Sequence, residues 1–509
     1  MTAGRKRTLV AGAIALAAAG AVTRGIGAVY HIIVARMVGA EVLGLFQMAL
    51  PLYRLASGAA LLGFHIAVVS RIADSLGRSR PDEAREYARA ALAAASFSGL
   101  AAGALVWVGA PLMVPLLFDD VRLVLAIRCL GLLLVPSTIT AVLRGILRGF
   151  GGAVAVAGAN VAEAVFRVPS VLAMLVAFLP FGAGAAAAAM VCGMVVGELG
   201  SLAILGLRVR PLMAGGGGAG RRSSISSGRY TRDLLRLGLP AMVSVMLNSI
   251  MSVVNAALVP RQLQAAGLTQ SEAAQAFGEV TGMVAPMLYF PMMAIGPIIQ
   301  VVTPAVAERM GAKQYGRVAD LLRKAFFIAG AVGAVFSAVL FLVPGLIGRV
   351  LYGAPHIAPL VRPLSVAAPF VYLGMVCSGV LHGLGQMAPV TANVFAGNVA
   401  RCVLICTLVS RPGWGAAVAV WAMVADHVVT AVLNIACLGW FMGLAKLGLG
   451  FSTERRSRSG CTPPSGGAPA VVLLPMEENL RREPCLAPSV GSSRARRCRG
   501  ARGLIQRPR

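Results

Sequence analysis

Basic side chains stand inside apolar segments that are otherwise long enough to cross a membrane. A charge at the centre of a bilayer costs about 2.5 to 3.5 kcal/mol, so each must face protein or water. Arg24 and Arg54 come near mid-depth of the first two segments, and His31 lies about two turns beyond Arg24. His65 follows Arg54 by about three turns on the same helix face. Arg24 and Arg54 could share one cavity, and basic groups in such a cavity would suit an anion.

Two further arginines are related by an internal repeat. Arg167 and Arg401 are 234 residues apart and fall at equal depth in the fifth and eleventh segments. Arg167 has an acid four residues before it, Glu163, so an ion pair within the helix is an equal alternative to a cavity role. Arg401 has no such local acid, which favours a cavity role there.

Polar groups in three other segments leave two interpretations open. Glu198 and Asp426 are the lone acids of the sixth and twelfth segments, and each could carry a coupling proton or only pair with a cation. Asn255 shares a helix face with Asn248 and could line a transport path or bond a neighbouring helix.

The sequence shows no nucleophile with an adjacent base and no cluster of metal ligands. The nine cysteines are scattered without a Cys-x-x-Cys pair. We therefore expect no catalytic residue, no metal site and no cofactor, and predict that the protein is not an enzyme.

The composition defines the class of protein that must position these residues. Hydrophobic residues make up 58% of the 509-residue chain, charged residues 13%, and the mean hydropathy is +0.80. Spanning helices need about 20 apolar residues each, and the alternation of a membrane barrel is absent. We predict an all-α integral membrane protein of about twelve helices, near 9–38, 41–72, 87–117, 121–150, 153–179, 182–207, 232–260, 272–306, 320–351, 357–384, 387–410 and 414–444.

The repeat predicts the domain organisation. At the offset of 234, Gly44 aligns with Gly278, and the Gly145 to Gly151 motif aligns with that from Gly379 to Gly385. Six helices in each half make the repeat parallel, with a pseudo-two-fold along the membrane normal, a central cavity and alternating access. The predicted parts are an N-terminal half (1–207), a cytoplasmic Gly/Arg/Ser linker (208–231), a C-terminal half (232–451) and a disordered basic tail (452–509).

The net charge of +27 is concentrated in alternate loops and in the tail. The loops near Arg80 and Lys313 are basic, whereas the opposite loops are short and nearly free of Lys and Arg. The positive-inside rule then places both termini and the linker in the cytoplasm of a multi-pass cell-membrane protein. No aromatic and basic binding module accompanies the charge, so nucleic acid is not an expected partner.

Several motifs resemble those of one family. They are Arg24-Gly-Ile-Gly, Ala35-Arg36-Met-Val-Gly39-Ala40-Glu41 and Pro51-Leu52-Tyr53 in the first half, and Val259-Pro260-Arg261 and Phe290-Pro291 in the second. The sequence resembles the stage V sporulation protein B family over about residues 10 to 450. That family belongs to the polysaccharide flippase branch of the superfamily that also holds lipid II flippases and multidrug antiporters.

The resemblance implies a flippase that moves an anionic lipid-linked saccharide from the cytoplasmic to the outer leaflet for cell-wall, spore-cortex or capsule synthesis. Arg24 falls on the first-helix arginine with which lipid II flippases hold the lipid diphosphate. Their Arg-Asp pair is Tyr30-His31 here, their eighth-helix arginine is Pro286, and Arg54 is one residue off their second-helix arginine. The implied partners are a lipid-linked sugar diphosphate, the bilayer and cell-wall synthesis proteins.

Two alternatives stay open. A cation-coupled multidrug antiporter of the same fold would need cavity acids and aromatics, whereas the cavity expected here is basic. A membrane glycosyltransferase would need a large outer loop with catalytic acids, and the outer loops are short.

Overall fold

The structure of the protein, a computed structural model, describes residues 3–214, 224–409 and 415–446. These residues belong to one compact unit, and the regular structure among them is helical throughout. The predicted tail, 452–509, lies outside the described residues, as does the middle of the predicted linker, 215–223. The described parts of that linker are helical, because one helix runs on to Ala214 and the next begins at Ser224.

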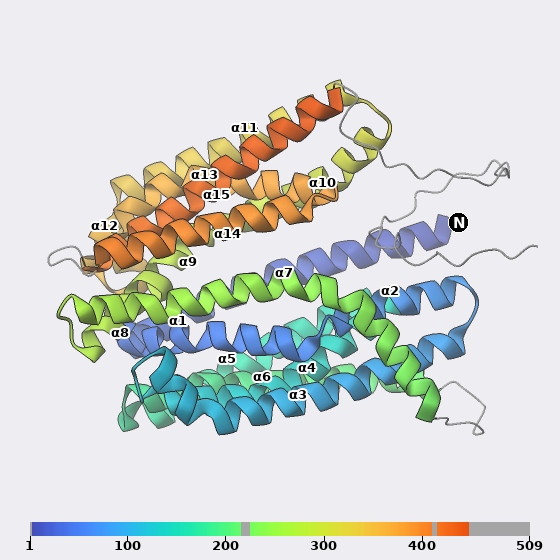
Figure 1. Ribbon diagram of the computed structural model, residues 1–509, viewed down its shortest axis with the longest axis horizontal. Coiled ribbons are helices and arrows are strands. Elements are labelled where there is room, and N and C mark those ends of the chain that lie inside the picture. The colour runs from blue at the N-terminus through green and yellow to red at the C-terminus, as the bar shows by residue number, and fades with distance from the viewer. Residues whose placement is uncertain (1–2, 215–223, 410–414, 447–509) are drawn as a thin grey trace, which may run out of the picture. The chain divides into compact units, whose positions relative to one another are not determined.

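The first half forms six α-helices (Figure 1). They are α1 (Ala3–Leu61), α2 (Phe64–Gly77), α3 (Pro81–Leu117), α4 (Leu123–Gly149), α5 (Ala153–Phe178) and α6 (Ala183–Ala214). Inside α1 the helix is interrupted at Gly39, where φ is +72° and ψ is −179°. Glycine adopts this backbone without the steric cost of a side chain, and the chain turns back there, so α1 holds two membrane passes.

The second half is more divided. Its elements are α7 (Ser224–Ala265), α8 (Gln270–Gly278), a π-helical turn (Glu279–Val284), α9 (Ala285–Tyr289), α10 (Met292–Gly311), α11 (Tyr315–Leu342), α12 (Pro344–Tyr352), α13 (Ala358–Gly383), α14 (Met387–Leu404) with a π-helical end (Ile405–Val409), and α15 (Gly415–Lys446).

Nine helical stretches in the described part of the chain are long and apolar enough to cross a membrane. One of them, Gly25–Gly77, contains two passes because of the turn at Gly39. α7 and the run from α8 to α10 are further long helical stretches beside these nine. The predicted all-α integral membrane fold is confirmed.

Three predicted helices are broken where the sequence reading made them continuous. The helix predicted for 41–72 stops at Leu61 and restarts at Phe64, because Leu62 and Gly63 both have positive φ. The helix predicted for 272–306 contains the π-helical turn and a break before α10, whose N-cap is Pro291. The helix predicted for 320–351 ends at Leu342, and Pro344 starts α12, since proline fits the first turn of a helix but not its interior.

A glycine contact marks the axis of the internal repeat. A Cβ placed on Gly44 of α1 would lie 2.0 Å from the oxygen of Ala274, and one on Gly278 of α8 would lie 1.9 Å from that of Ala40. Both pairings exchange residues that are 234 apart, and the amide of Gln47 bonds its own repeat mate at 3.4 Å. Residues exchanged by a two-fold can touch only beside its axis. The pseudo-two-fold therefore passes between α1 and α8.

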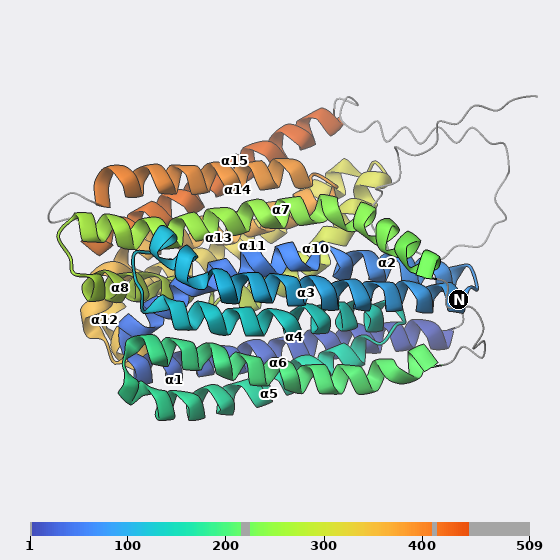
Figure 2. The same ribbon diagram turned by 60° about the horizontal axis from the view of Figure 1, so that its bottom comes forward.

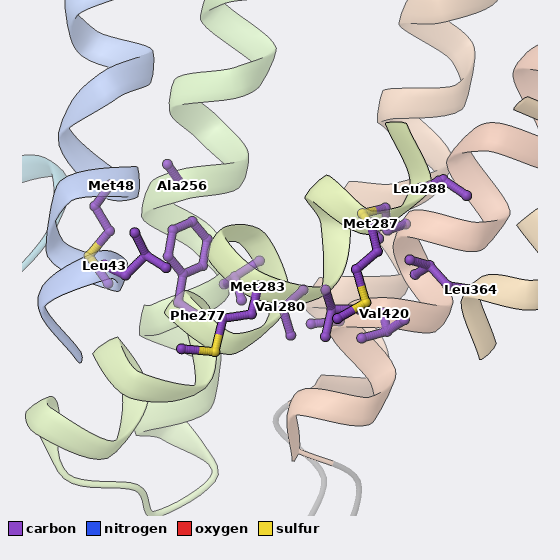
Figure 3. Packing of buried hydrophobic residues seen from close by; sticks show 14 of the residues in the cluster. Leu43, Met48, Ala256, Phe277, Val280, Met283, Met287, Leu288, Leu364 and Val420 are labelled. Carbon is purple, nitrogen blue, oxygen red and sulfur yellow. The ribbon is translucent and has the colours of Figure 1, made fainter. Parts of the chain in front are cut away.

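Apolar packing surrounds this contact. Leu43 and Met48 of α1 meet Phe277 of α8, and the cluster continues through Met287 to Leu364 of α13 (Figure 3). The side chains from the two halves thus form one hydrophobic core.

Glycine contacts recur at equivalent positions in the two halves. A Cβ on Gly145 or Gly149 would lie within 2.8 Å of an atom of α2, and one on Gly379 or Gly383 within 2.7 Å of an atom of α10. These glycines therefore serve as close helix contacts. The two halves share a packing scheme as well as a sequence repeat.

Candidate functional site

A cavity of about 330 Å³ lies between α1, α2 and α7. Arg54 and His65 line it, together with Tyr53, Ser57 and Ser249. In the described part of the chain the exposed Arg54 guanidinium has no ion-pair partner, and Nδ1 of His65 is buried without a hydrogen bond. The structure thus brings together two of the predicted site residues in a space that carries uncompensated basic groups.

The break between α1 and α2 positions these side chains. Gly63 packs against the second half so tightly that a Cβ would lie 2.3 Å from the oxygen of Gly238 in α7. On the other side, Gly145 of α4 allows close approach of the His65 backbone, with a Cβ only 2.7 Å from its oxygen. Two glycines therefore hold the start of α2 against two helices, which fixes where His65 can point.

A third basic group stands beside this cavity. Arg148 of α4 is exposed and lies close enough to His65 for the two to interact electrostatically. Arg148 therefore places a basic group next to His65, which lines the cavity.

His31 lies elsewhere. Its ring contacts Tyr352 at the end of α12 edge-on, with ring centroids 6.4 Å apart. Both ring nitrogens of His31 and the hydroxyl of Tyr352 are buried without a partner in the described structure. Arg36, one turn beyond, donates to the backbone oxygen of Leu351 at 2.9 Å. This stretch of α1 therefore packs against the C-terminal end of α12, where the Arg36 cation complements the exposed carbonyl groups. The side chain of Arg24 lies outside the described residues, although its backbone belongs to α1.

A network of ion pairs occupies the interior of the first half. Glu163 accepts from Arg167 at 3.0 Å within α5 and from Arg144 of α4 at 2.6 Å. The pair within the helix, one of the two interpretations of Arg167, is present. Arg144 of α4 thus reaches inward to the acid of the neighbouring helix.

Glu198 of α6 belongs to the same network. It lies 3.6 Å from the Arg144 guanidinium and accepts from the Thr140 hydroxyl at 2.9 Å. Of the two interpretations of Glu198, the structure therefore shows pairing with a cation. Two arginines and two glutamates balance one another, which reduces the cost of burying them.

The second half holds the repeat mate of Arg167 in a different setting. Gly397 stands where the first half has Glu163, and a Cβ there would lie 2.5 Å from Oδ1 of Asp426 in α15. Asp426 and Arg401 interact electrostatically, but no carboxylate of the described residues reaches Arg401 at ion-pair distance. Nε of Arg401 is buried without a partner there. An acid from another helix thus replaces the local acid of the first half, at longer range.

Asn255 joins two helices. Its Nδ2 donates to the oxygen of Met251 at 2.9 Å and to Oδ1 of Asn398 in α14 at 3.2 Å. The second interpretation of Asn255, a bond to a neighbouring helix, describes this geometry.

The sequence reading missed two residues beside Asp426. His427 follows it directly, and its Nε2 lies 3.5 Å from the hydroxyl of Tyr289 in α9. The criterion that singled out Arg24 and Asp426, an ionisable group inside an apolar segment, applies equally to His427 and would have found it.

Polar contacts join the two halves near the turn at Gly39. Arg122 donates to Glu41 at 2.6 Å and to Asp120 at 2.7 Å, and Ser271 of the second half also bonds Glu41. Arg261 bonds Asp119 at 2.8 Å. Hydrogen bonding to Asp120, helped by Glu41, raises the pKa of Arg122 above its ordinary value, so this cation keeps its charge.

Paired helical halves around a pseudo-two-fold, with charged groups inside the membrane-spanning region, define a polytopic membrane protein of the secondary-transporter type. The family described as "Polysaccharide biosynthesis protein" matches residues 9–310, and the family MatE matches residues 240–407. The first match covers more than half of the chain, which therefore belongs to the polysaccharide biosynthesis protein family. The predicted relationship to stage V sporulation protein B is confirmed.

Individual relatives agree with this assignment. The Stage V sporulation protein B of Bacillus subtilis (strain 168) is 27% identical over 440 residues, which cover 85% of this chain and 83% of that protein. Among solved structures, an inward-facing multidrug resistance MATE family transporter of the MOP superfamily gives a TM-score of 0.64 at 19% identity, covering 82% of this chain and 95% of that one. An outward-facing conformation gives 0.55 at 18% identity, covering 86% and 96%. These structures establish the two-lobed fold of that superfamily.

Proposed function

We propose that the protein moves an anionic lipid-linked saccharide from the cytoplasmic to the outer leaflet by alternating access. The observation that carries this proposal is the cavity between α1, α2 and α7, in which Arg54 and His65 have no compensating acid among the described residues. Uncompensated cations in a cavity favour an anion, and family membership favours a saccharide carrier as its source.

The chemistry of the cavity suits a diphosphate. A guanidinium such as that of Arg54 can donate two parallel hydrogen bonds to phosphate oxygens, while a neutral imidazole donates one more. The hydroxyls of Ser57 and Ser249 line the same space. Arg24 joins this set in our proposal, on the strength of the resemblance to lipid II flippases.

Movement of such a substrate needs no covalent step. An inside-negative potential favours outward transfer of negative charge by about 2.3 kcal/mol per charge per 100 mV. Asp426 remains our candidate for a coupling proton, because Glu198 is already engaged by Arg144 and Thr140.

Polar contacts join the halves at both ends. They lie around Asp119 and Arg261 at the end that the proposed topology places outside. At the opposite end, Arg71 and Tyr87 donate to Asp233 of α7 at 2.9 and 2.7 Å.

A cation-coupled drug exporter is the second candidate. The match of residues 240–407 to MatE favours it, as does the cluster of Asp426, His427 and Tyr289 in the second half. Arg54 would repel a cationic drug. Removing its charge should therefore increase export of such a drug, whereas it should decrease flipping of an anionic lipid.

The deciding experiment measures the leaflet accessibility of lipid-linked precursors in cells that depend on this protein. We expect Arg54→Ala to reduce flipping about tenfold or more, equivalent to ~1.4 kcal/mol of lost binding, with normal protein levels in the membrane. Arg54→Lys should restore part of it, since it keeps the charge but loses the planar donor geometry. Normal flipping by Arg54→Ala, or gained export of a cationic dye, would reject the proposal in favour of the exporter.

A further inference from the structure

An apolar groove of about 480 Å³ lies on the first half, between α3, α4 and α6. Its walls include Leu92, Ile139, Leu143, Leu202 and Val209. Figures 1 and 2 both show these three helices side by side, and none of the residues that line the groove lines the cavity of Arg54. The groove is therefore separate from the proposed substrate site.

One end of the groove is basic. Arg210 of α6 lines it, is exposed, and has no ion pair within the described ranges. Arg85 and Arg89 of α3 donate to the backbone oxygens of Leu212 at 3.2 Å and Met213 at 3.3 Å. These two arginines neutralise the negative end of α6, which would otherwise repel an anion.

The charges of Arg85 and Arg89 are themselves balanced. Arg85 pairs with Asp82 at 2.7 Å and Arg89 with Glu86 at 2.6 Å. Among the described residues, Arg210 is thus the cation at the mouth of the apolar groove that has no ion-pair partner.

Gly206 keeps the groove open. A Cβ at this position would have no atom within 4 Å, although the residue lines the groove. Two other glycines of the same helix behave differently, because a Cβ on Gly197 or Gly200 would lie 2.6 or 2.5 Å from a side chain of α5. Those two glycines allow close helix packing, whereas Gly206 leaves space that a bound molecule can occupy.

We propose that this groove binds an anionic phospholipid of the cytoplasmic leaflet, with one acyl chain along the apolar walls and the phosphate at Arg210. The walls match a hydrocarbon chain and the mouth matches a negative headgroup. The end of α6 near Arg210 is the end that the proposed topology places in the cytoplasm. The lipid is a resident of the first half and not the transported substrate.

Native mass spectrometry of the purified full-length protein tests this site, with phosphatidylglycerol and phosphatidylcholine of identical acyl chains as probes. We expect the protein to retain phosphatidylglycerol about fivefold more than phosphatidylcholine, the preference that one basic residue gives at an anionic lipid surface. Arg210→Ala should remove the preference. Gly206→Leu should reduce retention of both lipids, because the new side chain fills the groove.

Matched controls separate the site from general effects. Arg208→Ala removes another exposed arginine of α6, one that does not line the groove, and Gly158→Leu fills open space on α5. Both should behave like the unmodified protein. Equal retention of the two lipids, or loss of the preference in Arg208→Ala as well, would overturn the proposal. If Gly206→Leu does not fold, the comparison of Arg210→Ala with Arg208→Ala decides, since both positions are exposed.

Discussion

Arg167 and Arg401 occupy corresponding positions in the two halves, 234 residues apart, and their surroundings differ. Arg167 shares Glu163 with Arg144, and Glu198 balances the remaining charge. Arg401 has a glycine at the position of Glu163, and its electrostatic partner Asp426 stays beyond ion-pair distance.

The glycine contacts make this difference informative. Gly145 and Gly379 pack at the same repeat position in both halves, so the helix arrangement has been kept while the charges have changed. A charge-balanced network of ion pairs stabilises a structure but leaves little net charge to attract a ligand. We infer that the first-half network holds α4, α5 and α6 together, whereas Arg401 and Asp426 are free to respond to a substrate or a proton.

Removing the shared acid of the first half should have the largest effect on stability. Glu163→Gln leaves Arg144 and Arg167 without their common carboxylate, and breaking a buried pair in this way costs about 3 to 5 kcal/mol. Thermal unfolding of the purified protein in detergent would measure the loss. Asp426→Asn is the matched change in the second half and should cost clearly less. Equal destabilisation by both variants would mean that the halves are electrostatically alike.

The axis between the halves offers a second test. Gly278→Ala places a methyl group 1.9 Å from the oxygen of Ala40, so the helices must separate, at a cost of about 1 to 3 kcal/mol. Gly58→Ala is the control, because its Cβ would meet side-chain atoms of α7 at ordinary contact distances, 3.5 Å for the Met246 sulfur and 3.8 Å for Cγ1 of Val245. The same unfolding measurement applies, and wild-type stability of Gly278→Ala would show that α1 and α8 are not held in this contact.

Replacing each of the two arginines should distinguish a role in stability from a role in transport. We expect Arg401→Ala to reduce flipping about tenfold, ~1.4 kcal/mol, with little change in unfolding temperature, because it breaks no close ion pair. Arg167→Ala should do the reverse and lower stability more than flipping per molecule. Measuring both quantities for both variants is essential. Normal flipping of the precursor by Arg401→Ala would contradict the proposed role of Arg401 in transport.

Labelling of single cysteines tests the orientation without an expected effect on transport. Because the repeat is parallel, cysteines near Arg80 in the first half and Lys313 in the second should both react only from the cytoplasm. One near Asp119 should react only from outside. If Arg80 and Lys313 label from opposite sides, the two halves cannot be related by an axis along the membrane normal.

The sequence was sufficient to predict the class of fold, because the length of the apolar segments and the positions of the basic loops are set directly by the bilayer. It also offered the ion pair of Arg167 with Glu163 as one of two equal alternatives, since residues four apart in a helix are neighbours. It could not predict that Arg144 would reach Glu163, or that His31 would meet Tyr352. Depth in the membrane follows from position along a helix, but the partner depends on which helices pack together and on how each is rotated. The break at Leu62 was missed for a related reason, as its cause is the contact of Gly63 with Gly238 in a distant helix.

The contact of Gly44 with Gly278 has the form of a subunit interface. In a symmetric dimer of identical halves, a residue beside the two-fold faces its own copy, so every substitution there would occur on both sides at once. Joining the halves in one chain removes that restriction, and each position can then change alone. A single glutamate could be kept at 163 and lost at 397, a division of labour that no homodimer of one half could reach. The fused chain retains the geometry of a dimer and gains the freedom to be asymmetric.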